Sequence, residues 1–298
     1  MKLTRFRVPY KKEISLSDYP TDYSGKFKSK EQAEKLLQKN IKLMAELQDK
    51  LYAHDKYALL LIFQAMDAGG KDGAIKNVMS GLNPQGTQVF SFKQPSAEEL
   101  DHDYLWRINK SLPERGRIGI FNRSHYEELL VVRLHNLLDK EKLPEEIIKD
   151  NIWERRYRQF RDYERYLHEN AVRTVKFYLH LSKDEQKRRF LKRLDDPTKN
   201  WKFSSSDLKE RDHWDKYQKL FAETLSQTST KYGPWYIIPA DKKWFARLLI
   251  SDIIVKHLSD IKPEYPKMNE EQIKNLDIYR EKLLSEDVKV ETKESKKS

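Results

Sequence analysis

A short apolar segment that runs directly into a glycine-rich turn constrains this fold more than any other feature of the sequence. Residues 57–63 (Tyr-Ala-Leu-Leu-Leu-Ile-Phe) form an apolar run, which is typical of a buried parallel strand. The turn that follows contains Gly-Gly-Lys at 69–71, and residues 74–79 have the composition of the start of a helix. Such a strand, turn and helix bind phosphate, because backbone N–H groups, the helix dipole and the lysine ammonium all supply positive charge. We therefore expect the chain to bind and transfer phosphoryl groups.

The turn departs from the general phosphate-loop pattern, Gly-x-x-x-x-Gly-Lys-Ser/Thr, at two positions. Ala65 replaces the first glycine, and Asp72 replaces the hydroxyl residue that usually helps to hold Mg²⁺. A second carboxylate, Asp67, lies inside the loop, where an ATPase would rarely place negative charge beside a triphosphate. A plain turn is the simple alternative, because Gly-Gly occurs in many loops. The apolar strand before the turn and the helical pattern after it favour the phosphate site.

The chain is long enough for one substantial core. Its 298 residues, 38% of them hydrophobic, fit a single α/β domain better than two small domains. We assign that domain to residues 29–262 and an irregular extension to residues 1–28. A C-terminal extension takes residues 263–298, and we expect its last ten residues to be disordered.

Composition also excludes several classes of protein. No segment approaches the roughly 20 uninterrupted apolar residues that span a bilayer. No apolar stretch follows the basic residues at the N-terminus, as a secretory signal would require. The sequence has no cysteine, which excludes disulfides, thiolate metal sites and cysteine nucleophiles. These features predict a cytoplasmic protein without a membrane partner.

The positive charge of the chain is concentrated in one segment. The formal net charge is +11, and residues 187–202 contain seven basic and two acidic side chains, so this segment alone carries +5. A local cationic excess is what a polyanionic ligand requires. A solvated basic surface without a ligand is the simple alternative.

Four further apolar runs predict the rest of a parallel sheet. Besides residues 57–63, the expected strands lie at 87–92, 117–121, 175–181 and 235–239. Helical patterns occur at residues 29–54, 96–110, 125–138, 144–169 and 243–258. Strands separated by helices predict an α/β fold in three layers, an αβα sandwich with a five-stranded parallel sheet. Ligands bind at the carboxyl ends of such strands, so residues 67–73 and 122–127 are expected to meet at one rim.

Three motifs together resemble one enzyme family. They are residues 63–73 (Phe-Gln-Ala-Met-Asp-Ala-Gly-Gly-Lys-Asp-Gly), 121–127 (Phe-Asn-Arg-Ser-His-Tyr-Glu) and 195–204 (Asp-Asp-Pro-Thr-Lys-Asn-Trp-Lys-Phe-Ser). In this order and spacing they resemble the polyphosphate kinase 2 family over about residues 10–262. The Gln-Ala-Met-Asp loop and the His-Tyr-Glu ending resemble its class III. The resemblance implies a P-loop kinase fold similar to thymidylate kinase, with a mobile helical lid at about residues 183–218.

The resemblance also implies an activity and its partners. Members of the family transfer phosphoryl groups reversibly between inorganic polyphosphate and nucleotides, and class III members are associated with AMP and ADP as acceptors. The family pattern implies dependence on Mg²⁺, with Mn²⁺ as an alternative, and adenine or guanine nucleotides as partners. It implies no dedicated nucleic-acid partner, and it implies a homo-oligomer, since relatives are often dimers or tetramers.

Phosphoryl transfer needs charge neutralisation and in-line positioning, and the motif residues can supply both. Lys71 and the loop amides would hold a phosphate, and Arg123 would offer a planar fork to a phosphate pair. Asp67 would either bind Mg²⁺, which prefers one or two carboxylates plus phosphate and water oxygens, or orient the acceptor phosphate. Many family members carry aspartate where this chain has Asn122, which leaves one carboxylate fewer for the metal. The remaining candidate contacts of phosphate or nucleotide are Ala68, Gly69, Gly70, Asp72, Gly73 and Asn122 at the rim, and Arg189, Arg193, Lys199 and Lys202 in the lid.

Glu127 is the fourth candidate catalytic residue, and three roles remain open for it. Its carboxylate could share the metal with Asp67, contact the acceptor nucleotide, or cap a helix that begins near Ser124. Capping would stabilise that helix by about 0.3–1 kcal/mol through the helix dipole. The expected position at the rim favours a role with the phosphates.

The basic segment is expected to form the lid and one wall of a polymer channel. Arg189 and Arg193 stand four residues apart and would contact successive phosphates, while Phe190 and Leu194 pack on another helix face. Ser204 would begin the next helix as its N-cap. Two helices joined by a basic linker make a hinged flap, and its closure would exclude water.

Two other functions fit parts of the sequence. An ATP-dependent kinase of small metabolites or nucleotides would have a glycine at position 65 and a hydroxyl residue after Lys71, and the chain has neither. A basic nucleic-acid-binding protein is suggested by the isoelectric point of about 9.3 and by the arginine-rich, aromatic helix from Trp153. No helix-turn-helix, zinc-finger spacing or RNA-binding aromatic signature supports that function.

Overall fold

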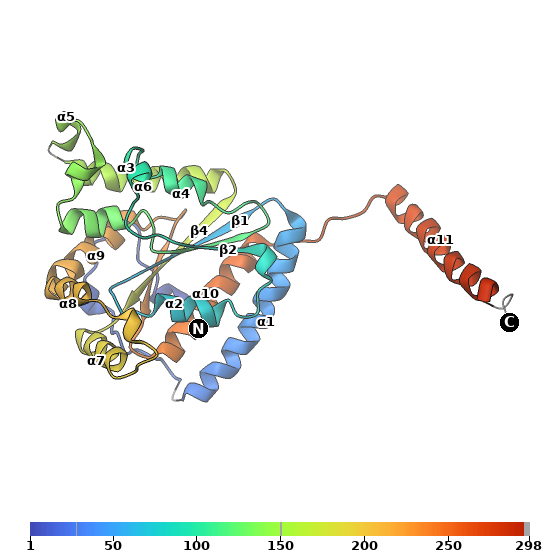
Figure 1. Cartoon of the computed structure of the whole chain (residues 1–298), viewed down its shortest axis with the longest axis horizontal. Helices are drawn as coiled ribbons and strands as arrows, with labels where there is room; N and C mark the ends of the chain where they lie inside the picture. The colour runs from blue at the N-terminus through green and yellow to red at the C-terminus, as the bar shows by residue number, and fades with distance from the viewer. Residues whose placement is uncertain (28, 150, 295–298) are drawn as a thin grey trace. The chain divides into compact units, whose positions relative to one another are not determined.

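A five-stranded sheet lies at the centre of the larger of two units into which the chain divides. The computed structural model describes residues 1–27, 29–149 and 151–294, and the two units are Met1–Pro263 and Glu264–Ser298. The strands are β1 (Ala58–Ala65), β2 (Thr87–Ser91), β3 (Ile118–Asn122), β4 (Val172–His180) and β5 (Trp235–Pro239). Their order across the sheet is β2-β3-β1-β4-β5, and every neighbouring pair is parallel (Figure 1). The five-stranded parallel sheet predicted from the sequence is therefore confirmed.

Helices cover both faces of this sheet, which gives the expected three layers (Figure 1). On one face lie α1 (Lys30–His54), α2 (Lys71–Val78) and α10 (Lys243–Ile261). On the other face lie α4 (Trp106–Lys110), α6 (Ile152–Glu169) and α9 (Trp214–Thr228). The remaining α-helices of this unit are α3 (Ala97–Leu100), α5 (Glu145–Ile148), α7 (Lys183–Leu194) and α8 (Ser205–Asp212). Turns of 3-10 helix occur at Leu3–Arg5, Leu16–Asp18, Pro84–Gly86, Leu138–Glu141 and Asn200–Lys202, and the π-helix η4 spans Glu128–Val132.

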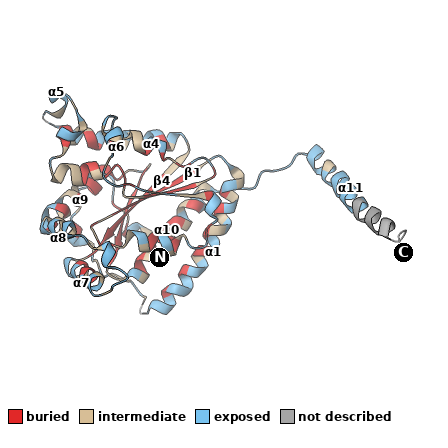
Figure 2. Ribbon diagram, viewed as in Figure 1, coloured by how far each residue is buried: buried red, intermediate tan, exposed pale blue. Residues whose placement is uncertain are grey.

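The apolar strand that the sequence singles out is the central element of the sheet. β1 pairs with β3 on one side and with β4 on the other, and its residues from Ala58 to Phe63 are at most 1% exposed. Phe63 stacks on Phe177 of β4, with ring centroids 4.8 Å apart. Figure 2 shows buried residues in the strands and on the helix sides that face them. Each large apolar side chain buried in this way contributes about 1.5–3 kcal/mol to folding, so the core holds the strand ends in fixed positions.

Two expected helices are interrupted in the structure. The segment 96–110 is split into α3 and α4, because the side chain of Asp103 accepts a hydrogen bond from Leu105 N (2.8 Å). This local bond competes with the helical hydrogen bonds. The segment 144–169 is split into α5 and α6, and Asn151, which precedes α6, has a left-handed backbone with φ 64°. Local side-chain and backbone geometry therefore ended helices that the apolar spacing alone would continue.

The N-terminal segment, expected to be an irregular extension, pairs with the edge of the sheet. Val8 N donates to Trp235 O (2.9 Å), and Ile237 N donates to Phe6 O (2.8 Å). Arg7 forms an antiparallel bridge with Tyr236 of β5. Phe6 and Val8 are buried at 3% and 0% exposure. The segment thus covers backbone groups of the outermost strand β5 and adds to the core.

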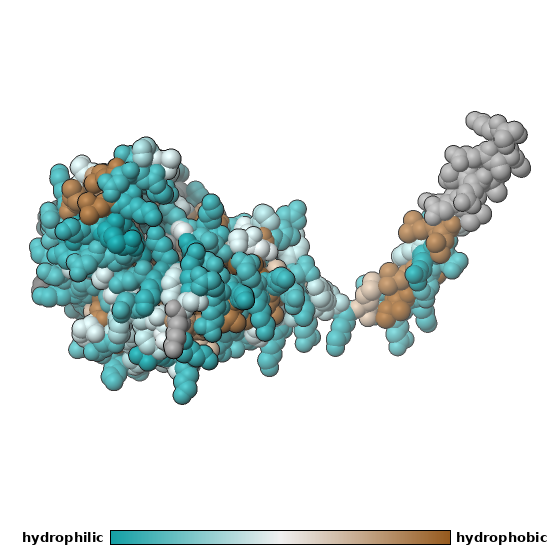
Figure 3. All heavy atoms as spheres, turned by 90° about the horizontal axis from the view of Figure 1, so that it is seen from below, coloured by the Kyte–Doolittle hydropathy of each residue, from teal (hydrophilic) through white to brown (hydrophobic). Residues whose placement is uncertain are grey.

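The C-terminal unit contains one long helix. The boundary that the sequence predicts after residue 262 lies one residue before the break between the units. α11 spans Glu270–Glu294, whereas the sequence predicts disorder in the last ten residues; residues 295–298 lie outside the described residues. Apolar side chains of α11 are exposed (Figure 3), among them Ile273, Leu276, Tyr279 and Leu283. Within the described ranges no helix is both long enough and apolar enough to cross a membrane.

Candidate functional site

The loop between β1 and α2 is shaped by close backbone packing that only glycine allows. Gly69 has no room for a side chain, because an added Cβ would lie 2.5 Å from Ala65 Cβ and 2.8 Å from Met66 O. Gly70 is the N-cap residue of α2 with φ 95°, and Ala68 also lies in the left-handed region, with φ 57°. The turn therefore brings the N-terminus of α2 to the carboxyl end of β1, where the sequence predicts a phosphate site.

Lys71 is a half-buried cation with an incomplete set of partners. Among the described residues its ammonium donates one hydrogen bond, to Ala65 O at 3.1 Å. Its pKa is lowered by burial first and then by Arg123, while three nearby carboxylates oppose the shift. An ammonium with free N–H groups and a lowered pKa gains from a nearby anion. Lys71 is therefore suited to bind a phosphate group.

Arg123 joins the two carboxylates of the predicted site. It follows β3 with φ 65°, and such left-handed geometry costs about 1–3 kcal/mol in a residue other than glycine. Its Nη2 donates to Asp67 Oδ1 (3.0 Å), and its Nη1 lies 3.8 Å from Glu127 Oε2. Asp67 and Arg123 are 56 residues apart in sequence and meet at one rim. The strand-end rule used on the sequence predicts this contact.

Glu127 lies in the wall of this site and makes no capping contact. It precedes the π-helix η4, which occupies Glu128–Val132 within the segment 125–138 where the sequence predicts an α-helix, and its side chain makes no capping hydrogen bond there. Both polar atoms of the Gln64 side-chain amide have hydrogen-bond partners when its nitrogen faces Glu127. In that orientation the nitrogen donates to Glu127 Oε1 (2.9 Å) and the oxygen accepts from Ser124. Burial raises the pKa of Glu127, and the charges of Arg123 and Lys71 oppose that rise. The structure thus shows no hydrogen bond that would support a helix-capping role for Glu127.

A second contact closes the rim between β3 and α2. Asn122 Nδ2 donates to Asp72 Oδ1 (2.7 Å). Both residues depart from an expected pattern, since Asp72 stands where the general phosphate loop has a hydroxyl residue and Asn122 stands where the family resemblance implies an aspartate in many members. An aspartate at position 122 would face the Asp72 carboxylate, so the amide removes a repulsion between like charges. Among the described residues, no three His, Asp or Glu side chains group closely enough to hold a metal ion by themselves.

Two cavities meet at this rim. The larger, of about 750 Å³, is lined by residues 67–74, by Arg123 and by cationic side chains of the lid segment and of α10. The smaller, of about 30 Å³, is lined by Glu127, Tyr217 and neighbouring side chains. Asp67 and Arg123 line both cavities. A group bound at Asp67 and Arg123 can therefore be approached from two sides.

The lid segment places part of its basic residues at the larger cavity. Arg193, Lys199 and Lys202 line it, as the sequence predicts for a channel wall. Arg193 also donates to Lys202 O (3.2 Å), and Lys199 forms an ion pair with Asp196. Both contacts lie within the lid segment, and they hold the basic linker between α7 and α8 against the end of α7.

Arg189 is largely occupied by contacts within the protein. Its side chain is 6% exposed, and its Nη1 donates to Ala68 O (2.9 Å) and to Gly69 O (3.0 Å). Its Nη2 donates to Ala240 O, and its Nε donates to Glu185 Oε1 (2.7 Å). Most of its N–H groups therefore bind the protein itself. Arg189 also lines the larger cavity, so the contact with successive phosphates that the sequence predicts for it together with Arg193 stays a prediction, with few N–H groups left to make it.

Several residues of the site were missed by reasoning from the sequence. Those that line the larger cavity are Lys93, Lys192, Lys243 and Arg247. A further one, Gln186 of α7, donates to Asp67 O (2.9 Å) and so supports the loop. Lys93 and Lys243 follow β2 and β5, so the strand-end rule could have found them. Arg247 and Lys192 lie within helices, where the packing of the helix decides which way a side chain faces.

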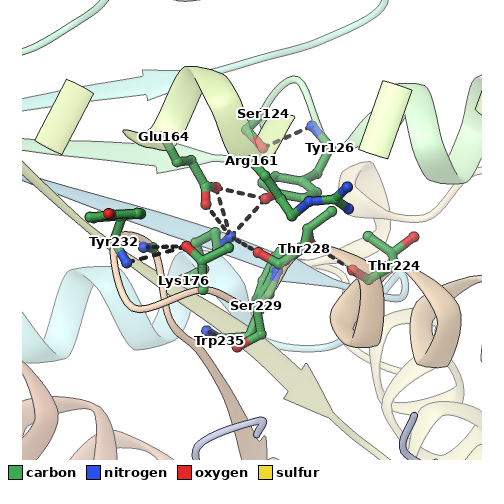
Figure 4. A network of polar contacts seen from close by, with 12 residues as sticks. Ser124, Tyr126, Arg161, Glu164, Lys176, Thr224, Thr228, Ser229, Tyr232 and Trp235 are labelled. Atoms are coloured by element: carbon green, nitrogen blue, oxygen red, sulfur yellow. Dashed lines mark hydrogen bonds and ion pairs between the residues drawn. The ribbon is translucent and has the colours of Figure 1, made fainter. Parts of the chain in front are cut away.

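A buried ion pair anchors the second motif from within the core. Lys176 of β4 donates to both oxygens of Glu164 (2.6 and 2.7 Å), to Tyr126 Oη (2.7 Å) and to Thr228 O (2.9 Å) (Figure 4). Tyr126 in turn donates to Glu164 Oε1 (2.6 Å). The two charged side chains are 0% and 1% exposed. Tyr126 belongs to the turn that carries Arg123, so this network fixes the turn in place.

Comparisons with known proteins point to one family. A sequence profile described as polyphosphate kinase 2 matches residues 26–266. The chain is 50% identical to the ADP-polyphosphate phosphotransferase of Rhodopseudomonas palustris over 286 residues, which cover 95% of this chain and 99% of that protein. It is 42% identical to the AMP/ADP-polyphosphate phosphotransferase of Meiothermus ruber over 267 residues, 89% of this chain and 96% of that protein. The crystal structure of polyphosphate kinase 2 from Arthrobacter aurescens is similar, with a TM-score of 0.82 and 37% identity over 92% of this chain and 95% of that chain.

Proposed function

The chain belongs to the polyphosphate kinase 2 family, and we propose that it transfers the terminal phosphoryl group of inorganic polyphosphate to AMP and to ADP. The family expected from the three motifs is thereby confirmed. The choice of acceptors is supported by the relatives, one named for ADP and one for AMP and ADP. The observation that carries the proposal is that Asp67 and Arg123 line two cavities at once.

The larger cavity would hold the polymeric donor with its end at the loop. Backbone N–H groups of the loop and the free N–H groups of Lys71 would bind the terminal phosphate. Arg123 would add donors from the end of β3, because its contacts to the two carboxylates leave further N–H groups free. These cations would neutralise charge on the phosphoryl oxygens in the transition state.

The transferred group would pass between the two cavities. A nucleotide phosphate oxygen forms a bond to the terminal phosphorus, the bond from that phosphorus to the bridging oxygen of the polymer breaks, and the polymer leaves one phosphate shorter. Arg123 would donate hydrogen bonds to the phosphates, and Asp67 would accept a hydrogen bond from the acceptor phosphate or bind the metal, so that the two phosphates lie in line. The smaller cavity, of about 30 Å³, has no room for a nucleotide, so we propose that the lid segment moves to admit the acceptor.

Asp67 and Glu127 fit a magnesium ion shared with the substrates. Both carboxylates line the smaller cavity, and proteins bind Mg²⁺ through one or two carboxylates together with phosphate oxygens and water. When bound, the ion would neutralise charge on the phosphates. Arg123, which contacts both carboxylates, would exchange one of these contacts for a phosphate.

An end-point assay tests the proposed function. Purified protein is incubated with Mg²⁺, AMP and long-chain polyphosphate, and the nucleotides are separated by chromatography. ADP and then ATP should form, and chelation of the metal with EDTA should stop both reactions. If neither nucleotide forms, the proposed function is wrong.

Two controls separate the other functions that the sequence left open. Transfer from ATP to small metabolites, with no transfer from polyphosphate, would instead support an ATP-dependent kinase. The Lys71→Ala variant should lose turnover and retain any binding of nucleic acid to the basic helices. The two outcomes differ because a nucleic-acid-binding protein does not depend on this one ammonium group.

A further inference from the structure

We propose that a further adenine nucleotide binds in a cavity beside the two connections of the lid segment, away from the transferred group, and that it holds the lid segment in the position that the structure shows. This cavity, called the hinge cavity below, has a volume of about 470 Å³. Its lining shares no residue with either of the two cavities at the rim. The proposal rests on the proposed function, because it acts on the lid movement that admits the acceptor.

Three segments that are far apart in the sequence form the walls of the hinge cavity. They lie within residues 14–21 of the N-terminal segment, at residues 180–183 between β4 and α7, and on the face of α9 that carries Gln218. Since the lid segment spans about residues 183–218, both places where it joins the rest of the unit belong to these walls. A molecule bound in the hinge cavity therefore contacts the lid segment at both ends.

Hydrogen bonds connect the three walls to one another. Asp241 Oδ1 accepts from Ser182 N (2.8 Å), and Asp241 Oδ2 accepts from Thr21 Oγ1 (2.7 Å). Ile14 N donates to Ser226 Oγ of α9 (3.1 Å). The N-terminal segment is thus bonded close to the start of the lid segment and to the helix at its end. Because the walls are fixed before a ligand binds, little ordering opposes binding.

Two buried polar groups of the hinge cavity match one edge of adenine. His180 is 6% exposed, and burial lowers its pKa, so the ring is neutral at pH 7. Its Nδ1 donates to Tyr19 O (3.1 Å), which leaves Nε2 as a hydrogen-bond acceptor. Gln218 Nε2 is buried without a partner among the described residues, so it is a free donor. Adenine presents an amino donor beside a ring-nitrogen acceptor, and it is the base that the proposed reaction supplies.

The rest of the lining suits the other parts of a nucleotide. Leu16, Leu181 and Trp214 are at most 7% exposed and offer apolar surface to the face of a base. Lys183 and Lys219 are exposed and can meet phosphates, and none of the described lining residues is acidic. The volume lies within the range of small-molecule sites. Because the lysines favour greater negative charge, the product ATP should bind more tightly than AMP.

A nucleotide in the hinge cavity would slow the reaction. In the position that the structure shows, the smaller cavity of about 30 Å³ has no room for the acceptor. A ligand that fits the walls in this position shifts the population of molecules towards it, because it binds the moved lid segment less tightly. ATP would then restrain its own formation, and additional AMP would not relieve this effect.

Three variants and a control test the hinge cavity by isothermal titration calorimetry. Ala222→Trp fills the cavity with a large side chain, and Gln218→Leu removes the free donor. Lys183→Ala with Lys219→Ala removes the two charges. Ala97→Trp is the control, because Ala97 is exposed in α3 and lines none of the three cavities. ATP is titrated into each protein in the presence of EDTA, which prevents turnover.

Ala222→Trp should bind one ATP fewer per chain than the wild type, whereas Ala97→Trp should bind the same number. Gln218→Leu should weaken binding at one site by about tenfold, since one hydrogen bond is lost. The double lysine variant should weaken it by about fivefold, the change that two exposed charge contacts produce. If Ala222→Trp does not fold, these two variants decide whether the site exists.

Initial rates with labelled AMP and long-chain polyphosphate test the effect on the lid segment. In the wild type, added ATP should lower the rate even at saturating AMP. In Ala222→Trp, saturating AMP should restore the full rate, because ATP then competes only at the rim. Without ATP, the rate of this variant should stay within about twofold of the wild type, since Ala222 lies outside the transfer site.

Three results would overturn the proposal. The first is an equal number of ATP sites, with equal affinities, in the wild type and in the hinge-cavity variants. The second is binding of tripolyphosphate in the hinge cavity as tight as that of ATP, because phosphate alone would then account for binding. The third is inhibition of the wild type that saturating AMP fully relieves. A wild type without turnover that still binds one ATP more than Ala222→Trp would contradict the proposed function and leave the site in place.

Discussion

Two lysines of this protein, Lys71 at the rim and Lys176 in the core, have opposite surroundings. Lys176 donates to four acceptors within 2.9 Å, among them both oxygens of Glu164. Lys71 donates to one, Ala65 O, within the part of the chain that the structure describes. Burial lowers the pKa of both, for Lys176 to about 8. An ammonium group whose N–H groups all donate to the protein stabilises the residues around it. An ammonium group with few partners in the protein has N–H groups free for a substrate.

One short turn, residues 123–126, connects the rim with the buried ion pair of the core. Tyr126 reaches into the core pair, and Arg123, three residues earlier, reaches the rim. The core is closely packed around the pair, since an added Cβ on Gly233 would lie 2.2 Å from Glu164 Oε2. A turn that is anchored at one end can keep charged groups in fixed positions at the other. The predictions below separate the two regions.

The largest expected effect contrasts the two lysines directly. Lys71→Ala should reduce kcat by about 10³-fold or more, because the transition state loses a cation. Its free energy of unfolding should change by less than about 1 kcal/mol, because one hydrogen bond is lost. Steady-state kinetics and chemical denaturation measure the two quantities. A loss of stability as large as that of a Lys176 variant would remove the distinction between the regions.

The next effect lies in the core. Lys176→Met should lower the free energy of unfolding by about 3–5 kcal/mol, because Glu164 is left buried without its cation. Adding Glu164→Leu should restore much of that loss, since no unpaired charge then remains in the core. Urea denaturation of the single and double variants tests this. A double variant as unstable as the single one would show that the ion pair is not the cause.

A smaller effect distinguishes the loop from the lid. Arg189→Lys should lower kcat by about tenfold and leave the KM for polyphosphate nearly unchanged, because lysine lacks the fork that holds Ala68 O and Gly69 O. Arg193→Ala should instead raise the KM for polyphosphate and leave kcat nearly unchanged. Initial rates at varied polymer concentration separate the two patterns. A higher KM in Arg189→Lys would support the role that the sequence predicts for Arg189.

The smallest effect concerns His125, which lies beside Tyr126. Neither ring nitrogen has a hydrogen-bond partner within the described residues, and burial, followed by the charges of Lys176 and Arg107, lowers its pKa to about 3. In the unfolded chain its pKa is about 6.5, so between about pH 6.5 and pH 3 only the unfolded state takes up this proton. Stability from this group is therefore complete above that window and falls as the pH falls through it.

His125→Phe should remove that part of the pH dependence. It should also raise the free energy of unfolding at pH 7 by about 1 kcal/mol, because two unsatisfied polar atoms leave the core. Denaturation at pH 7 and at pH 5 measures both changes, and activity at pH 7 should stay near that of the wild type. If the variant and the wild type lost the same stability between pH 7 and pH 5, His125 would not be a source of the pH dependence.

The rim could be predicted because parallel strands align their carboxyl ends. Asp67 and Arg123 come from separate motifs, and both follow strands that the apolar runs located. The glycine positions of the loop were readable for a similar reason, since Gly69 and Gly70 are set by backbone geometry within a few residues. Neither inference needs the packing of the rest of the chain.

The direction of the lid side chains could not be predicted in this way. Spacing places Arg189 and Arg193 on one face of a helix, and both line the larger cavity. Arg189 is nevertheless only 6% exposed and bound to the loop, whereas Arg193 is 24% exposed. The position of α7 against the loop decides this difference. The same holds for α10, where the sequence shows an amphipathic helix and the structure adds Lys243 and Arg247 to the cavity.

By itself the sequence determined the five strands and the long helices beside them, the family, and the chemical groups that end β1 and β3. Apolar periodicity and glycine geometry act over a few neighbouring residues, so they can be recognised without the fold. Only the tertiary structure decided the burial of Arg189, the contact of Asn122 with Asp72 and the cations that α10 contributes. These features depend on contacts between residues that are far apart in the sequence. Asn122 and Asp72 are separated by 50 positions, and Arg189 and Ala68 by 121. The packing of whole layers sets such contacts.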